Sequence, residues 1–520
     1  MFYLTEDELT LGKQAVLFHG VGSFFPPPPE LRIVEDDWDA VVDHIQKLDL
    51  DTYKPNPVLN SYVAKDSKVI RPIELLHIQD VLILVTLCRL LRDSVVAARL
   101  PTSSKKSFSY RAGSRREALY ETSGAFEKYR TQTAKRLRLK KARYVATIDI
   151  ADFFSNVYQH RLENSLQAAA KTTREVDAVR VLAKLLSNFS GNNSYGIPTG
   201  PYACRVLAEA LLIDVDGALE QKGVDFVRWM DDFTVFTKTH GQAVEVIQYL
   251  SKWLREHHGL TLNLKKTEVY EKDKFVNDVW KTYDEEHKHF RDLVRRMQAE
   301  SLYDTDEADP DDDGDEEDEV TPEDVASVFD LALRIEDEPK YGLTRHILER
   351  VVFREDFDSD VRRQIIDKAI ANVDRLFPVL DAICKALARS TEFTKTEVKK
   401  FCSSILADLS KKTIFVPGHS LFWIVWLIGE AGLTKLSAKL LTIYQSTDDL
   451  VVRRECLIAM SKVSSRADVL HVKDSYDELS QSVRIALVMA TSRMAKDERS
   501  HWKKSKVISD VYEKAAFKFD

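Results

Sequence analysis

A run of acidic residues in the middle of the chain most constrains how this sequence can fold. Residues 304–319 (DTDEADPDDDGDEEDE) contain twelve acids and no base. Such a stretch buries too little apolar surface to offset the entropy lost on ordering, so we expect a disordered linker or loop that neither flanking fold needs. Without these acids the net charge of the 520-residue chain changes from −8 to +4. The remainder is mildly basic, and the acidic total does not exclude nucleic acid as a partner.

Hydrophobic patterns differ on the two sides of this run. On its N-terminal side, residues 35–100 are expected to be mostly helical, and YVATIDIADFF (144–154) has the β-branched pattern of a buried strand. A helix is predicted at 241–258 and a further strand at 260–270. On its C-terminal side, apolar stripes at helical spacing recur with short loops, typical of stacked helix pairs, at 361–387, 421–445 and 450–464. The sequence therefore predicts an α+β domain over 1–300, a linker over 301–321 and an all-α domain over 322–520.

Acidic residues stand at the ends of two predicted strand segments. Asp149 and Asp152 end the segment that starts at 144, and Asp231 and Asp232 lie in a predicted hairpin, FVRWMDDFTVF (226–236). Asp is common in turns, so one interpretation is a solvated, capped turn. If the strands are neighbours, the carboxylates would repel one another unless they shared divalent cations. Two such cations about 4 Å apart stabilise the attacking and leaving oxygens of phosphoryl transfer.

A second charged feature is basic. Residues 135–143 (KRLRLKKAR) contain six Lys or Arg in nine positions, which fits either attraction of phosphates or a solvated helix face. Five cysteines are dispersed without a CxxC pair, which favours a reduced, cytoplasmic protein. The start of the chain does not resemble a signal peptide, and the apolar run at 81–91 is too short to span a bilayer, so we expect no membrane association.

Five motifs in order resemble the reverse transcriptase family. They are RPIELLHIQD (71–80), TIDIADFF (147–154), GIPTGPYACRVLAEALL (196–212), RWMDDF (228–233) and LNLKKTEV (262–269). The resemblance spans about residues 65–275 and implies a fingers and palm domain. Because all five motifs occur in the family's order, the sequence favours a metal-binding role for the acids over the interpretation as a solvated, capped turn.

The resemblance also implies roles for individual residues. Asp149, Asp231 and Asp232 would be the catalytic acids and would bind two Mg²⁺ or Mn²⁺ ions. The remaining candidates would contact the incoming deoxynucleotide: Phe154 as a gate against the 2′-hydroxyl, Pro198 and Gly200 in the loop beside the base, Lys266 near the triphosphate, and Arg71 and Arg111 as phosphate contacts.

Departures from the family pattern point to a subgroup. Thr199 stands where templated enzymes commonly carry Gln, Trp229 stands where Tyr or Phe is usual, and no thumb is recognisable after residue 275. The layout is similar to the bacterial abortive-infection reverse transcriptases, which defend against phage. That resemblance implies template-independent DNA synthesis from dNTPs, primed by a tyrosine of the protein, so that single-stranded DNA becomes covalently attached. It also implies a HEAT-like helical domain and a homo-oligomer.

The resemblance does not identify which tyrosine would act as the primer. Tyr3, Tyr53 and Tyr62 fit loosely, and each is also explained by ordinary packing. Two other functions stay open: a templated RNA-directed DNA polymerase of the retron or intron type, and an inactive scaffold that binds nucleic acid.

Overall fold

The computed structural model describes residues 1–280, 321–333, 339–355, 357–410 and 418–518. The acidic run 304–319 and the predicted boundaries at residues 300 and 301 lie outside these residues. The chain divides into two compact units. Unit 1 contains Met1–Leu59, Ile73–Asp278 and Ser509–Lys518, and unit 2 contains Asn60–Pro72 and the described residues from Val279 to Ile508. The chain therefore leaves unit 1 after residue 59 and returns at residue 73. It leaves again after residue 278 and returns at residue 509.

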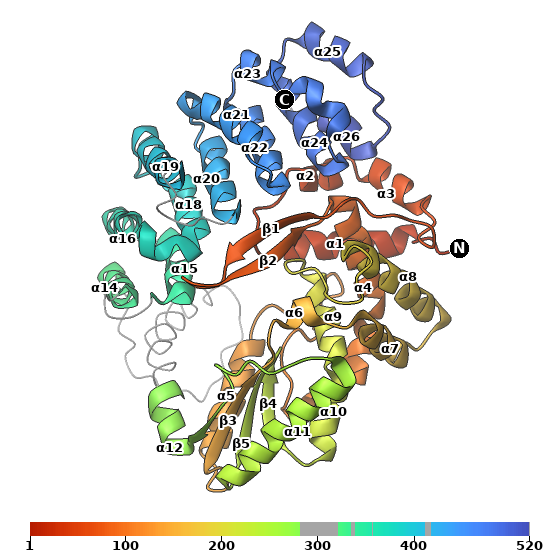
Figure 1. Ribbon diagram of the computed structural model, residues 1–520, viewed down its shortest axis with the longest axis vertical. Coiled ribbons are helices and arrows are strands. Elements are labelled where there is room, and N and C mark those ends of the chain that lie inside the picture. Colours follow the sequence, from red (N-terminus) through yellow and green to blue (C-terminus); the bar gives the residue numbers. More distant parts are fainter. Residues whose placement is uncertain (281–320, 334–338, 356, 411–417, 519–520) are drawn as a thin grey trace. The chain divides into compact units, whose positions relative to one another are not determined.

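The core of unit 1 is a four-stranded sheet in the order β4-β5-β3-β6, with every neighbouring pair antiparallel (Figure 1). Its strands are β3 (Tyr144–Asp149), β4 (Asp225–Trp229), β5 (Asp232–Thr237) and β6 (Glu268–Glu271). Val145, Ala146 and Ile148 of β3 are all buried, as expected of a central strand covered on both faces. This confirms the strand predicted from residue 144. The strand predicted at 260–270 was too long, because only its last residues pair with β3.

Helices cover this sheet and complete unit 1. Helix α11 (His240–His258) packs on β3, β5 and β6, while α5 (Ala125–Leu137) packs on β4 and β5. The sequence of α11 explains its position, because Ala243, Val246, Leu250 and Leu254 form one buried stripe at helical spacing. The other helices of unit 1 are α1 (Glu6–His19), α2 (Glu30–Asp36), α3 (Trp38–Gln46), α4 (Ile78–Ala98), α6 (Phe153–Asn156), α7 (Gln159–Ala169), α8 (Thr173–Phe189), α9 (Ala203–Leu211), α10 (Ile213–Gln221), α12 (Lys272–Lys274) and α26 (Val511–Ala516).

Residues 59–75 form a hairpin of β1 (Leu59–Ala64) and β2 (Ile70–Leu75), so the prediction of mostly helix over 35–100 was wrong there. In β1, Leu59, Ser61 and Val63 are buried while Asn60 and Tyr62 are exposed. This alternation is the strand signal that the surrounding helices obscured. The hydroxyl of Ser61 donates a 2.9 Å hydrogen bond to Asp449, which explains why the middle of the hairpin belongs to unit 2.

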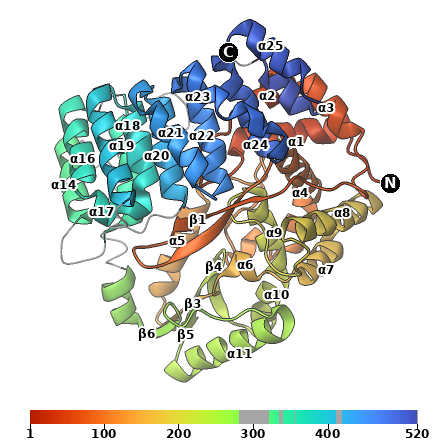
Figure 2. The same cartoon turned by 45° about the horizontal axis from the view of Figure 1, so that its top comes forward.

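The rest of unit 2 is helical wherever the structure describes it. Helices α14, α16, α18, α20, α22 and α24 pack one on the next in that order, and α15, α19 and α21 pack beside them (Figure 2). The bounds are α14 (Pro322–Ala332), α15 (Tyr341–Glu349), α16 (Ser359–Ala371), α17 (Val373–Leu376), α18 (Leu380–Arg389), α19 (Lys395–Ser410), α20 (Gly418–Glu430), α21 (Ser437–Ser446), α22 (Leu450–Val463), α23 (Arg466–Leu470), α24 (Gln481–Ala490) and α25 (Lys496–Lys504). The predicted mixed α+β region followed by a helical region is thus confirmed. No helix among the described residues has the length and apolar character needed to cross a membrane.

A buried ionic cluster lies beneath the β4–β5 hairpin. Arg228 of β4 is fully buried and forms ion pairs with Glu209 at 3.0 Å and with Asp216 at 2.6 Å. Arg99, also buried, lies 2.6 Å from Glu209. Burial alone would lower the pKa of Arg228, but the charges of Asp216 and Glu209 outweigh it and raise that pKa. Arg228 is therefore ionised at neutral pH despite its burial.

The same cluster holds the turn that joins β4 to β5. Met230, the first of the two turn residues, has a φ of 53°, a conformation that is strained for a side chain of this size. Its carbonyl accepts a 2.8 Å hydrogen bond from Arg228, and its N–H donates at 2.9 Å to the hydroxyl of Ser109. Ser109 in turn donates to Glu209. Both peptide groups of the strained residue are thus fixed by one buried network.

Replacing Arg228 by Met should strongly destabilise unit 1. The substitution leaves Glu209 and Asp216 buried with fewer opposite charges, and breaking a buried ion pair from one side costs about 3–5 kcal/mol. We expect a large fall in the unfolding midpoint in urea or on heating. The control is Arg32→Met, which removes a guanidinium whose ion pair with Asp36 is exposed, and which should change stability by less than about 1 kcal/mol. Equal midpoints for both variants would contradict the importance of the cluster.

Candidate active site

Three carboxylates meet at one end of the sheet. Asp149 is the last residue of β3, Asp232 is the first residue of β5, and the two are paired across the strands. Asp231 is the second residue of the turn before Asp232. Directly opposed residues of antiparallel strands have Cβ atoms about 4.5–5.5 Å apart. The register therefore brings together the acids that the sequence placed 82 residues apart.

Asp149 is buried, and both of its carboxylate oxygens have partners. Lys266 Nζ lies 3.1 Å from Oδ1, and Asn263 Nδ2 donates to Oδ2 at 2.8 Å. The N–H of Asn263 also donates to the carbonyl of Asp149 at 2.8 Å, which fixes the loop before β6 against the end of β3. Burial alone would lower the pKa of Lys266, but the charges of Asp149 and Asp232 outweigh it and raise that pKa. Lys266 is therefore a firmly charged partner of the acid cluster.

The remaining two acids are hard to ionise together. Loss of hydration, followed by the charge of Asp149, raises the pKa of Asp231. Loss of hydration, a hydrogen bond with Asp149 and the charge of Asp231 together raise the pKa of Asp232 to about 7. Asp231 and Asp232 are thus harder to ionise than free aspartates, even with Lys266 beside them.

Divalent cations fit this donor set by its chemistry. Hard cations such as Mg²⁺ take oxygen ligands, and added positive charge would relieve the repulsion that raises the pKa values of Asp231 and Asp232. Among the described residues no group of three or more His, Cys, Asp or Glu side chains is already arranged to hold a metal ion. The ammonium of Lys266 stands where a cation would neutralise Asp149. Binding of metal at Asp149 would therefore require this lysine to shift.

The segment after β3 leads to the predicted sugar gate. Asp152 has a φ of 42° and is followed by the short helix α6, which carries Phe153 and Phe154. Phe153 is buried and contacts the half-buried Phe154 edge to face at 5.9 Å. The carbonyl of Phe154 accepts a 3.0 Å hydrogen bond from the N–H of Ile197. This bond joins the gate to the loop that contains Pro198 and Gly200.

That loop is held from a second side by Glu74. The N–H of Thr199 donates to Glu74 Oε2 at 2.6 Å, and the carbonyl of Thr199 accepts from the N–H of Glu74 at 3.3 Å. Gly200 has a φ of 135°, where a side chain would be strained, and Pro198 is buried. The loop is therefore a fixed surface, held between β2 and α6.

Sequence reasoning missed the residues that support the site. Asn263 bonds the candidate acid Asp149, and Glu74 bonds the loop that contains Pro198 and Gly200. Ser109 and Arg228 bond the turn before Asp231. Asn263, Glu74 and Arg228 lie inside the motifs that carry the resemblance. The motifs therefore included these supporting residues but did not indicate what each of them contacts. Nothing in the sequence around Ser109 indicates its role, because its partners are distant along the chain.

The two predicted arginines lie in different surroundings. Arg111 donates to the carbonyls of Ser107 at 2.9 Å and Leu100 at 2.7 Å, and burial lowers its pKa to about 10. Its guanidinium thus supports the backbone next to the ionic cluster. Arg71 lies on β2, in the part of the hairpin that belongs to unit 2.

The tyrosines differ in their availability. Tyr53 is mostly buried, donates to Asp80 at 2.6 Å and accepts from Gln79 at 2.8 Å. Burial and the charge of Asp80 raise its pKa, so its phenol is poorly suited to lose a proton. Tyr3 and Tyr62 are exposed by 41% and 51%. Tyr195 is also 51% exposed and stacks on Tyr158, directly before the loop of Pro198.

One protein family and one solved structure are similar to parts of this chain. The family described as reverse transcriptase (RNA-dependent DNA polymerase) matches residues 64–277. Among solved structures the chain is similar to telomerase from Candida albicans in complex with a TWJ fragment of telomeric RNA, at 11% identity and a TM-score of 0.32. This similarity covers 77% of the present chain and only 64% of the telomerase chain. No curated protein sequence matches. The chain therefore contains a reverse transcriptase domain, a nucleotidyltransferase, over residues 64–277.

Proposed function

We propose that this protein is a metal-dependent DNA polymerase that extends DNA without a template from one of its own tyrosines, in defence against phage. The observation that carries the polymerase chemistry is the pairing of Asp149 with Asp232 beside Asp231, within a reverse transcriptase domain. The carboxylates would hold two Mg²⁺ or Mn²⁺ ions, which supply charge stabilisation to phosphoryl transfer. A hydroxyl oxygen attacks the α-phosphate of a dNTP, the bond to the pyrophosphate group breaks, and the hydroxyl proton leaves.

The chain's own residues divide the remaining work. Lys266, once displaced from Asp149, would neutralise or protonate the leaving pyrophosphate. Phe154 would exclude a 2′-hydroxyl, and the loop of Pro198 and Gly200 would support the base. Asn263 keeps the carboxylate of Asp149 oriented when the lysine moves.

The untemplated and self-primed part of the proposal has separate support. Thr199 replaces the family's Gln, and the sequence after residue 275 has no recognisable thumb to grip a duplex. Unit 2 provides stacked helices, which we assign to a HEAT-like domain that also builds a homo-oligomer. A single strand needs less enclosure than a duplex and can be held by charge and stacking. The family description, an RNA-dependent DNA polymerase, keeps templated synthesis as the second candidate.

Replacing Asp231 by Asn should reduce nucleotide incorporation by at least about a hundredfold, because metal ions supply several kcal/mol of transition-state stabilisation. Incorporation of labelled dNTPs measures the effect, and circular dichroism checks the fold. The control is Asp225→Asn in the same hairpin, since Asp225 pairs with Arg136 and Lys141 and not with the acid cluster. A well-folded Asp231→Asn variant with normal incorporation would remove Asp231 from the catalytic residues.

Replacing Phe154 by Val should admit ribonucleotides. The smaller side chain leaves room at the 2′ carbon, so the preference for dNTP over rNTP, measured as the ratio of kcat/KM values, should fall at least about tenfold, or about 1.4 kcal/mol. Phe154→Tyr is the matched control, because it keeps the ring and should keep the preference. Unchanged discrimination in the Val variant would place the gate elsewhere.

Incubation with labelled dNTPs and Mg²⁺ or Mn²⁺, without template, should attach label covalently to the protein. The label should then move with the protein on a denaturing gel, since a tyrosine oxygen forms a phosphodiester with the first nucleotide. Protease digestion should release a labelled peptide with one tyrosine, and the exposed Tyr3, Tyr62 and Tyr195 are more accessible to solvent than Tyr53. Label that appears only with a primed RNA template, and runs free of protein, would establish the templated candidate instead.

A further inference from the structure

Three basic residues stand side by side at the end of the sheet opposite the carboxylates. Arg143 directly precedes β3, Lys238 directly follows β5, and Lys272 directly follows β6. Backbone hydrogen bonds hold them together: the N–H of Arg143 donates to the carbonyl of Thr237 at 2.8 Å, and the N–H of Lys272 donates to the carbonyl of Arg143 at 2.8 Å. The order of the strands therefore forms a row, Lys238–Arg143–Lys272, which we call the basic row.

The basic row costs stability unless an anion is present. Neighbouring strands lie about 4.7–4.9 Å apart, and like charges opposite one another across strands are destabilising. In the part of the chain that the structure describes, none of the three side chains forms an ion pair. Lys140, from the basic run 135–143, joins them at the same cavity without an ion pair to any described residue. Packing within unit 1 gives no reason for four cations here.

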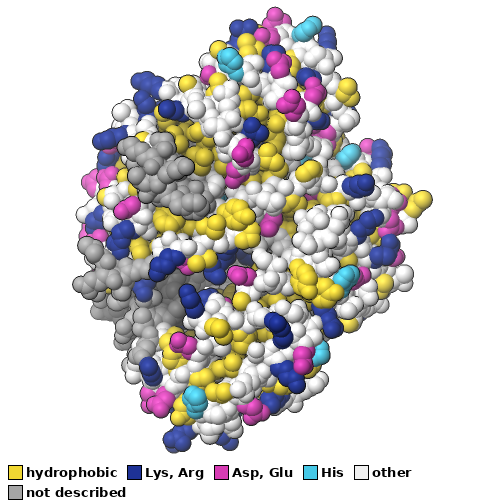
Figure 3. All heavy atoms as spheres, in the orientation of Figure 1, with side chains coloured by type: hydrophobic (Ala, Val, Ile, Leu, Met, Phe, Trp, Pro, Cys, Tyr) yellow, Lys and Arg dark blue, Asp and Glu magenta, His cyan; other side chains and the backbone are white. Residues whose placement is uncertain are grey.

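A cavity of about 550 Å³ lies over the basic row. Besides the four cations, its lining includes Thr239 and His240 at the N-terminus of the 19-residue helix α11, where the helix dipole favours negative charge. Two acids, Glu271 and Asp273, also line it, so the net charge of the ionised lining groups is +2. Figure 3 shows Lys and Arg side chains beside a histidine, with acidic side chains among them, at the lower edge of the view.

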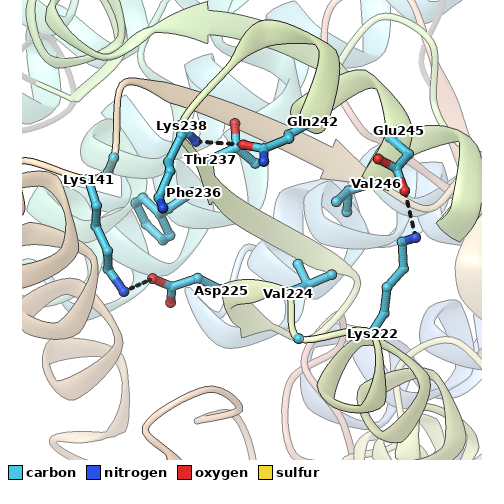
Figure 4. Close-up of a pocket in the computed structure, with 12 residues that line it drawn as sticks. Lys141, Lys222, Val224, Asp225, Phe236, Thr237, Lys238, Gln242, Glu245 and Val246 are labelled. Carbon is cyan, nitrogen blue, oxygen red and sulfur yellow. Dashed lines mark hydrogen bonds and ion pairs between the residues drawn. The ribbon is translucent and has the colours of Figure 1, made fainter.

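A neighbouring cavity contains lysines that do form ion pairs, and these serve as a comparison for the basic row. It has a volume of about 290 Å³ and is lined by Lys238 of the basic row and by two other lysines, Lys141 and Lys222, which each pair with an acid (Figure 4). Lys141 lies 3.4 Å from Asp225, and Lys222 lies 2.7 Å from Glu245. Lys141 and Lys222 are therefore already neutralised by acids of the fold. The side chains of the basic row form no such ion pair with any described residue.

We propose that Arg143, Lys238 and Lys272, with Lys140, form a phosphate-binding site that takes adjacent phosphate groups of a nucleic-acid strand or of a nucleoside triphosphate. Arg143 lies six positions before Asp149, a distance of about 20 Å along the strand. The site is therefore distinct from the carboxylates and does not bind the nucleotide that reacts there. Arginine supplies a planar fork for phosphate oxygens, and the lysines supply point charges around it.

The test compares the full chain with an Arg143→Gln/Lys238→Gln/Lys272→Gln variant by fluorescence anisotropy. The probes are a fluorescein-labelled 20-nucleotide oligo-dT and a fluorescent ATP analogue, both in EDTA, so that neither metal binding nor synthesis contributes. If the row binds a strand, the variant should bind oligo-dT at least about tenfold more weakly. Its slope of log affinity against log salt should also fall by about 2, since each phosphate neutralised on a single strand contributes about 0.7.

A second triple variant, Lys47→Gln/Lys222→Gln/Lys252→Gln, controls for the loss of charge. Each of these lysines is on unit 1 and already pairs with an acid. Loss of oligo-dT binding only in the basic-row variant supports a nucleic-acid strand as the ligand. Loss of only the ATP analogue supports a nucleoside triphosphate. Equal losses in both triple variants, or no loss in either, would overturn the proposal. The result does not depend on the proposed polymerase activity.

Discussion

The arrangement of the three carboxylates depends on a buried set of charges beneath the turn that carries them. Arg228 must remain ionised inside the protein to hold the carbonyl of Met230, and it can do so because Asp216 and Glu209 are buried with it. A positive φ at a methionine is unfavourable in isolation, so the turn persists because surrounding groups fix both of its peptide bonds. This fixed turn determines the position of Asp231, which follows Met230 directly. A softer turn would leave one carboxylate free to move away from the other two.

The carboxylates themselves show the opposite electrostatic arrangement. In the ionic cluster each acid has a guanidinium, and the pKa of Glu209 is held low by Arg228 and Arg99 against the effect of burial. At the active site three acids share one ammonium, and the pKa of Asp232 rises to about 7. The acids of the ionic cluster are thus neutralised by the fold, while the carboxylates at the turn above it keep an excess of negative charge. Such an excess is expected where divalent cations complete the site.

The sequence predicted the elements that carry most of the candidate site because its motifs are local and chemically distinctive. The strand at 144, the hairpin at 226–236 and the helix at 241–258 follow from hydrophobic period and turn residues, and the structure confirms them. The hairpin at 59–75 was missed because its alternation is short and lies between long helices. The basic row was invisible in sequence, since Arg143, Lys238 and Lys272 come together only through strand pairing. Long-range register decides such sites, and one sequence does not specify it.

The division of the chain shows the same limit for whole units. The sequence predicts one helical domain over 322–520, but α26 belongs to the compact unit that contains the four-stranded sheet. It packs on α2 and α3, and Lys518 forms an ion pair with Asp37. Its Tyr512 is fully buried, with its ring 5.1 Å from that of His77, at the start of α4. The unit with the active site is therefore complete only when residues from beyond the helical unit have joined it. Its stability cannot be assigned to the reverse transcriptase domain alone.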